Sequence, residues 1–105
     1  MQCKICSKND TESIRYYIWV NDGEWRPFID AQLFTEWLAK SATKHKKIAI
    51  DEAVEKYRKA LVSNPSAILK IIQAKRPEVT EWKIIYDYVC DECRKVVHSS
   101  KFSKV

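Results

Sequence analysis

The chain is 105 residues long, 46% hydrophobic, and carries a formal net charge of +5 from 19 basic and 14 acidic side chains. This length suits one domain, residues 1–105, with a modest core, and four Trp, five Tyr and three Phe argue against long disordered stretches. Gly23 is the only glycine, which excludes the glycine-rich loops that hold nucleotide phosphates, and therefore a nucleotide cofactor.

Aromatic and β-branched residues are concentrated in residues 13–20, which predicts a β-strand. Asp22-Gly23 follows, and we expect a two-residue turn there because Asp-Gly pairs readily take the positive φ angles of a tight turn. Residues 24–29 form the return strand, and Pro27 marks it as an edge because proline cannot donate to a neighbouring strand. One face then holds Tyr16, Ile18, Val20, Trp25 and Ile29, and the other holds Tyr17, Trp19, Arg26 and Phe28. Both faces are apolar, so we expect both to be covered.

Three helices are predicted after the hairpin. Asp30 suits the N-cap of the first helix, and the second covers about residues 51–62. The third has Asn64 as its N-cap and Pro65 at its first position, where the missing N–H does no harm. Pro77 ends it, because the residue before a proline disfavours helical backbone.

Four cysteines form two C-x-x-C pairs: Cys3 with Cys6, and Cys90 with Cys93, the latter directly after a strand predicted over residues 82–89. Zn²⁺ prefers four such ligands in a tetrahedron, and a tight C-x-x-C turn points two sulfurs the same way. We therefore expect the two pairs to bind one Zn²⁺. Four thiolates leave no position for water, so this zinc would be structural rather than catalytic, and it would close nearly the whole chain into a loop.

Two other uses of these cysteines are less suitable. Iron accepts the same four-sulfur shell, but zinc is the commoner occupant of such sites. A thioredoxin-like redox motif needs a strand before its first cysteine, and Cys3 leaves no room for one. The sequence also shows no signal peptide or membrane span. We therefore expect a reducing, cytoplasmic location, in which paired cysteines bind metal rather than form disulfides.

The elements follow the order C-x-x-C turn, β-hairpin, helical insert, strand, and a C-x-x-C pair that opens a helix. Around the second pair the chain reads Cys90-Asp91-Glu92-Cys93-Arg94-Lys95, with acids before bases as the helix dipole favours. This order resembles the treble-clef zinc fingers, in which a knuckle, a hairpin and a helix N-terminus surround one zinc. The resemblance covers about residues 1–29 and 82–102 and implies a zinc module there, within an α+β fold. The three-helix insert predicted at residues 30–80 has no counterpart in the simplest members of the group. Treble clefs serve in nucleic-acid binding, nuclease chemistry and protein docking, so the resemblance implies no single role.

The sequence predicts no catalytic site. Nuclease members of the treble-clef group carry a histidine pair or a histidine and asparagine set on the hairpin and helix, which this hairpin lacks. His45 and His98 are the only histidines. His98 could be a spare ligand or a general base, but a surface histidine on a helix explains it better, and His45 lies among lysines. We expect a non-catalytic binding module.

The charge is unevenly distributed along the chain. Residues 40–76 hold ten basic and three acidic side chains, and residues 94–105 add four basic ones. We predict that the helical insert binds nucleic acid through phosphate contacts, with Tyr17, Trp19 and Arg26 stacking on bases if they are exposed. The phosphate-binding candidates are Lys40, Lys44, Lys46, Lys47, Lys70, Lys75 and Arg76. The competing interpretation is that the lysines form a solvated face and the aromatic residues belong to the core.

The same charge supports a second hypothesis, in which the insert docks on an acidic surface of a larger protein. The chain would then be a protein-interaction module, or a small regulator or inhibitor like those that some viruses encode. Substitution of lysines should weaken nucleic-acid binding and its salt dependence, whereas exposed Trp or Tyr anchors should dominate protein binding.

Overall fold

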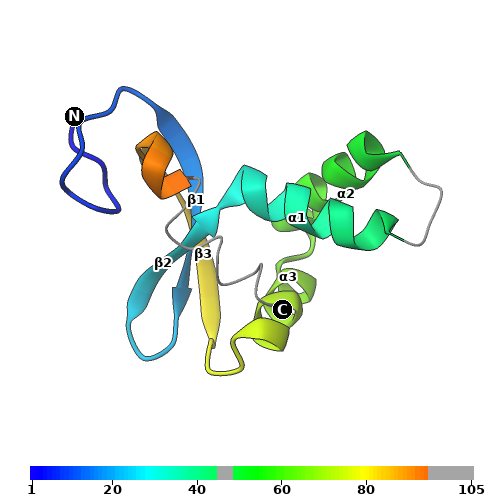
Figure 1. Cartoon of the computed structure of the whole chain (residues 1–105). Helices are drawn as coiled ribbons and strands as arrows, with labels where there is room; N and C mark the ends of the chain where they lie inside the picture. Colours follow the sequence, from blue (N-terminus) through cyan, green and yellow to red (C-terminus); the bar gives the residue numbers. More distant parts are fainter. Residues whose placement is uncertain (45–48, 95–105) are drawn as a thin grey trace.

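A computed structural model of the chain describes residues 1–44 and 49–94 (Figure 1). The elements in chain order are β1 (Ile14–Asn21), β2 (Trp25–Asp30), α1 (Ala31–Thr43), α2 (Ile50–Ser63), α3 (Pro65–Lys75) and β3 (Glu81–Tyr88). The strands form an antiparallel sheet in the order β2-β1-β3. The cysteine pair before β1 and the pair after β3 cluster together. The predicted α+β fold and its order of elements are confirmed. None of the helices described is both long and apolar enough to cross a membrane.

The hairpin differs from the prediction in its turn. The last pair between β1 and β2 joins Asn21 to Trp25, so the connection is residues 22–24 rather than a two-residue turn. Gly23 does take a positive φ, of 117°, and its N–H donates to Asn21 Oδ1 at 2.9 Å. The additional loop residue shifts the register of β2 by one position. Such a shift moves each side chain of the strand to the opposite face.

A β-bulge opposite Ile18 and Trp19 changes the register of β2 a second time. Both Phe28 and Ile29 are directed into the core that contains Ile18. The predicted faces of Trp25, Arg26 and Phe28 are therefore wrong, whereas the bulge restores the predicted face of Ile29.

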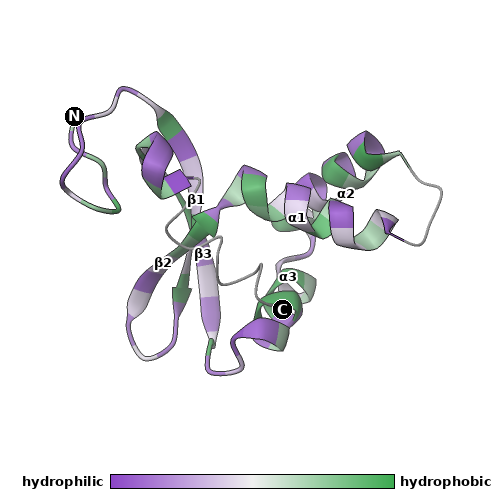
Figure 2. Cartoon of the chain, viewed as in Figure 1, coloured by the Kyte–Doolittle hydropathy of each residue, from purple (hydrophilic) through white to green (hydrophobic). Residues whose placement is uncertain are grey.

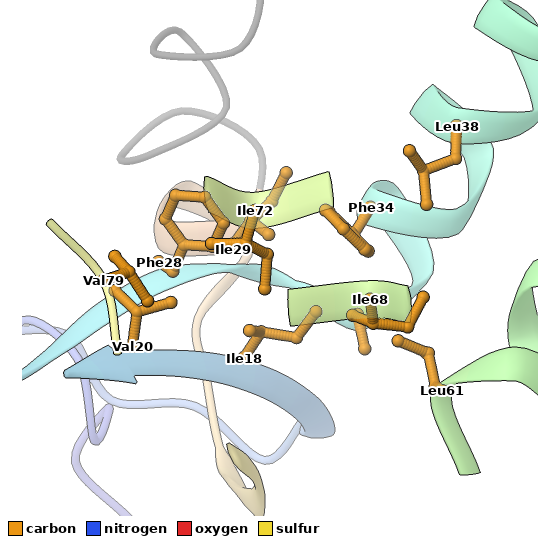
Figure 3. Close-up of a cluster of buried hydrophobic side chains, with 11 residues drawn as sticks. Ile18, Val20, Phe28, Ile29, Phe34, Leu38, Leu61, Ile68, Ile72 and Val79 are labelled. Carbon is orange, nitrogen blue, oxygen red and sulfur yellow. The ribbon is translucent and has the colours of Figure 1, made fainter. Parts of the chain in front are cut away.

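Each face of the hairpin packs against a core, as predicted, although Tyr16 stays 59% exposed. Ile18 and Val20 belong to the main core beneath the helices, whereas Tyr17 lies on the opposite face among the cysteines. Figure 3 shows side chains from β1, β2 and all three helices converging on the main core. The labelled residues are Ile18, Val20, Phe28, Ile29, Phe34, Leu38, Leu61, Ile68, Ile72 and Val79. The helical insert thus occupies one face and leaves the other to the cysteine cluster.

Side-chain caps fix where two of the helices begin. Asp30 Oδ1 accepts the N–H of Leu33 at 3.0 Å at the start of α1, and Asn64 Oδ1 accepts the N–H of Ala67 at 3.4 Å at the start of α3. Both caps were predicted, because Asp and Asn satisfy free N–H groups in the first turn. Hydrophobic and hydrophilic residues alternate along α1 and α2 (Figure 2), as expected for helices buried on one side.

Candidate metal centre

The four cysteine sulfurs lie together at one end of the sheet. The Sγ atoms of Cys3, Cys6, Cys90 and Cys93 all lie within 4.8 Å of one another, and those of Cys6 and Cys90 are 4.0 Å apart. A tetrahedral shell with metal–sulfur bonds near 2.3 Å would place its sulfurs about 3.8 Å apart, so the cluster is close to the size of such a shell. Cys6 is half-buried and the other three are buried. The four thiols can therefore hold one metal ion.

A closed loop carries the first cysteine pair. The N–H of Cys3 donates to Asn9 O at 2.8 Å, and an antiparallel bridge closes the base of the loop. Inside the loop, the N–H of Ser7 donates to Cys3 O at 2.9 Å, and Ser7 takes a left-handed φ of 58°. This tight turn brings the sulfurs of Cys3 and Cys6 to the same side.

The second pair sits on a helical turn at the end of β3. The N–H of Arg94 donates to Cys90 O at 3.0 Å, which closes the turn. The first loop is attached to the same place, because the N–H of Lys4 donates to Tyr88 O at 2.8 Å. Figure 1 shows the N-terminal loop and this short helical turn side by side. The sheet therefore brings together two pairs that are far apart in the sequence.

The helical turn is also connected to the insert. Arg94 Nε lies 3.8 Å from Oδ1 of Asp30, a buried carboxylate that caps α1. Asp30 thus caps the first helix of the insert and, through Arg94, also contacts the helical turn that carries the second cysteine pair.

Hydrogen bonds to sulfur support the cluster. Cys3 Sγ accepts the backbone N–H groups of Ile5 and Cys90, each at 3.4 Å. The side-chain amide of Asn9 donates to Cys90 Sγ at 3.4 Å and to Glu92 Oε2 at 3.0 Å. This role of Asn9 was not predicted. The one sign of it in the sequence is a short amide side chain close after the first C-x-x-C pair.

The cysteines differ in how readily they become thiolates. Hydrogen bonds from the backbone of Asn9 and Lys8 lower the pKa of Cys6 to about 6. Burial alone would raise the pKa of Cys90, but the Asn9 amide and other hydrogen bonds bring it below its ordinary value. Burial and the neighbouring sulfurs raise the pKa of Cys93 well above its ordinary value. Several negative charges in so small a volume repel one another, and a bound cation would offset that repulsion.

The basic residues that were predicted to contact phosphates differ in their exposure and in whether another side chain already contacts them. Lys40, Lys44 and Lys70 are exposed. Lys75 lies over the ring of Trp37, with Nζ 5.2 Å from the ring centroid. Arg76 is paired with Asp22, at 3.1 Å, and with Glu78. The remaining candidates, Lys46 and Lys47, lie outside the described residues, as do His45 and His98.

The aromatic residues proposed to stack on bases are not on the surface. Tyr17 is completely buried, so it cannot receive a base, and Trp19 is half-buried against the cysteine cluster. Among the residues that the structure describes, the exposed aromatic rings are instead Tyr16 and Tyr86, which stack on each other with centroids 4.5 Å apart. Here the interpretation of Tyr17 and Trp19 as core residues is the better one.

Comparison of the chain with protein-family models, with curated proteins and with solved structures finds no match. The assignment of a function therefore depends on the site geometry alone.

Proposed function

We propose that the cysteine cluster binds one Zn²⁺ as a structural ion, and that the chain is a non-catalytic binding module related in design to the treble-clef zinc fingers. The observation that carries this proposal is the convergence of four sulfurs, three of them buried, within 4.8 Å. Four thiolates complete a tetrahedral shell and leave no position for water or substrate, which is typical of structural zinc. A reducing, cytoplasmic environment would keep the thiols available for the metal.

Metal analysis tests the zinc assignment. Protein purified without added metal, then reconstituted separately with Zn²⁺ and Fe²⁺, should retain one zinc per chain after dialysis. Cobalt substitution should give the intense sulfur-to-metal absorption of a four-thiolate site, and Cys6→Ser should weaken it. A chain that retains iron in preference to zinc, or that binds neither, would contradict the assignment.

We further propose that the basic insert binds nucleic acid. Lys40 lies in the last turn of α1 and Lys44 at its C-cap, and both are exposed. The basic stretch at residues 45–47 follows them in the sequence. Lys70 on α3 adds a third exposed cation. Lys75 and Arg76 contribute less, because Lys75 lies on Trp37 and the charge of Arg76 is balanced by two carboxylates. Such a surface would recognise phosphates rather than bases.

Fluorescence anisotropy with labelled duplex and single-stranded probes tests this second proposal. Lys40→Glu with Lys44→Glu should weaken binding and reduce the slope of log affinity against log salt by about one unit for each phosphate that the protein no longer neutralises. Lys56→Glu with Lys59→Glu makes the same change in net charge on α2 and serves as the control. Equal weakening in the two double variants would indicate a general charge effect and not a nucleic-acid surface.

Protein docking is the second candidate function, and one observation favours it. Four large apolar residues line a single groove and remain exposed: Ile14 at 45%, Tyr16 at 59%, Val62 at 84% and Tyr86 at 62%. Contiguous exposed apolar surface of this kind commonly marks an interaction site.

A further inference from the structure

The outer edge of β3 is unpaired among the residues that the structure describes, because the sheet ends there. The N–H of Val89 donates inward to Ser13 O, whereas the carbonyl of Tyr88 faces outward and accepts from Lys4. Backbone groups alternate in direction along a strand. Every second residue before Tyr88 therefore has the same outward direction. The backbone N–H and C=O groups point away from β1, toward the free edge, at Trp82, Ile84 and Tyr86.

The opposite edge of the sheet is protected. Pro27 lies opposite Trp19 in β2, and the bulge next to it interrupts the regular ladder. Proline and bulges are common devices that prevent pairing at an edge. β3 is a regular eight-residue strand whose register with β1 runs without a bulge and whose sequence contains no proline. The sheet thus has one blocked edge and one edge that is able to accept another strand.

A groove lies beside the free edge, on the face that carries the helices. Its volume is about 700 Å³. The stacked rings of Tyr16 and Tyr86 form part of its wall, Ile84 lies next to them, and Leu61 and Val62 of α2 line it too. A strand added to β3 would place every second side chain on this same face, beside Ile84 and Tyr86. The groove could therefore take the apolar side chains of such a strand.

The charge around the groove indicates the chemistry of its occupant. Arg58 lines the groove with 64% of its side chain exposed, and its ion pair with Glu55, at 3.4 Å, leaves part of its guanidinium open to a ligand. Lys59 follows it on the exposed surface of α2. Asp30, an acid in the lining, is buried and lies close to Arg94. A second copy of this chain would bring two molecules of formal charge +5 together. An acidic partner is better matched to this surface.

We propose that the free edge of β3 and the adjoining groove bind an extended peptide segment of another protein, in which the side chains on the groove-facing side, at every second position, include both apolar residues and carboxylates. The peptide adds a fourth strand through the backbone groups of Trp82, Ile84 and Tyr86. Its apolar side chains enter the groove, and its acidic groups meet Arg58 and Lys59. This inference depends on the protein-docking function proposed above and is independent of nucleic-acid binding.

The test uses a labelled peptide in which every second residue is valine or glutamate in turn and the residues between them are threonine, so that valine and glutamate share one face of the strand. It is titrated by fluorescence anisotropy against the zinc-loaded full chain. The same peptide with lysine in place of glutamate is the matched control. The glutamate peptide should bind at least about tenfold more tightly than the lysine peptide. Hydrogen exchange at the amides of Ile84 and Tyr86 should slow in its presence, because these N–H groups become hydrogen-bonded.

Variants locate the binding to the proposed surface. Tyr86→Pro removes an outward N–H without removing a β1–β3 hydrogen bond, and it should abolish binding. Because proline could disturb the strand, Arg58→Glu and Val62→Glu on the exposed face of α2 provide a second test, and each should weaken binding about tenfold. Lys40→Glu with Lys44→Glu should leave peptide binding unchanged, which separates this proposal from nucleic-acid binding.

Three results would overturn the proposal: equal binding of both peptides, binding of the glutamate peptide that all three variants retain, or no binding at all. Concentration-dependent dimerisation that Tyr86→Pro removes would also overturn it, since the occupant of the edge would then be a second copy.

Discussion

Removal of the proposed zinc ion should cost this protein a large part of its stability. The metal would hold Cys6 and Cys90 together, and these residues are separated by 84 positions in the chain. If the metal acts as a crosslink, keeping a loop of that length closed contributes about 4–5 kcal/mol by restricting the unfolded state. The whole free energy of unfolding of a domain is about 5–15 kcal/mol. Chelation should therefore lower the melting temperature by about 20–30 °C, or unfold the protein outright if its stability is at the weaker end of this range.

Thermal unfolding followed by circular dichroism measures this effect. Wild-type protein should melt at a much lower temperature after treatment with a strong zinc chelator, and Cys90→Ser should melt at a similarly low temperature without it. The chelator should not lower the melting temperature of Cys90→Ser any further, because both changes remove the same crosslink. If the wild-type melting temperature is unchanged by both the chelator and the substitution, then the cysteine cluster does not hold the fold together through a metal.

Three further pairs of substitutions each test one feature of the structure by urea denaturation. Ser7→Val should cost about 1–2 kcal/mol because Ser7 has a positive φ, whereas Ser7→Gly should be nearly neutral; equal destabilisation would contradict backbone strain as the cause. Asp30→Ala should cost about 1–2 kcal/mol by removing the cap of α1, and Asp30→Asn should cost less because it keeps an accepting oxygen. Ile72→Ala should cost about 2–5 kcal/mol, since Ile72 is fully buried in the core, whereas Val62→Ala at an 84% exposed position should change stability by less than about 0.5 kcal/mol.

The cysteine site could be predicted because its chemistry is local. Each C-x-x-C pair specifies its own tight turn, and four soft ligands have few other uses in a chain this small. The caps at Asp30 and Asn64 were predictable for the same reason, since a capping side chain bonds to an N–H only three residues away. The cysteine turns and the two helix caps, which depend on neighbouring residues, were therefore predicted correctly from the sequence.

The hairpin shows where such reading fails. The Asp22-Gly23 signal gave the position of the turn but not its length, and one additional residue in the connection reversed the face of Trp25. The bulge next to Phe28 depends on packing against the helices rather than on a local signal, because it directs two consecutive side chains into one core. The support that Asn9 gives to Cys90 likewise depends on contact between distant segments.

The sequence shows that the insert is positively charged, but it does not show which of its cations are available to a ligand. Arg76 and Asp22 are separated by 54 positions, yet they are paired across the end of the hairpin. A count of lysines and arginines cannot distinguish such a structural ion pair from a cation available to a phosphate. The folded arrangement leaves Lys40, Lys44 and Lys70 as the exposed candidates among the described residues.

Metal loss should also change the free edge of β3. The N–H of Lys4 donates to Tyr88 O at 2.8 Å, so the first cysteine loop covers the edge position that follows Trp82, Ile84 and Tyr86. Without a metal, that loop is held by hydrogen bonds and by the packing of Cys3 and Ile5 alone, and its departure would lengthen the unpaired edge. Because exposed edges pair with other chains, metal-depleted protein should form oligomers, detected by light scattering at a temperature below its unfolding transition. Tyr86→Pro should suppress these oligomers without restoring the melting temperature. Oligomers that form equally in Tyr86→Pro would mean that another surface causes the association.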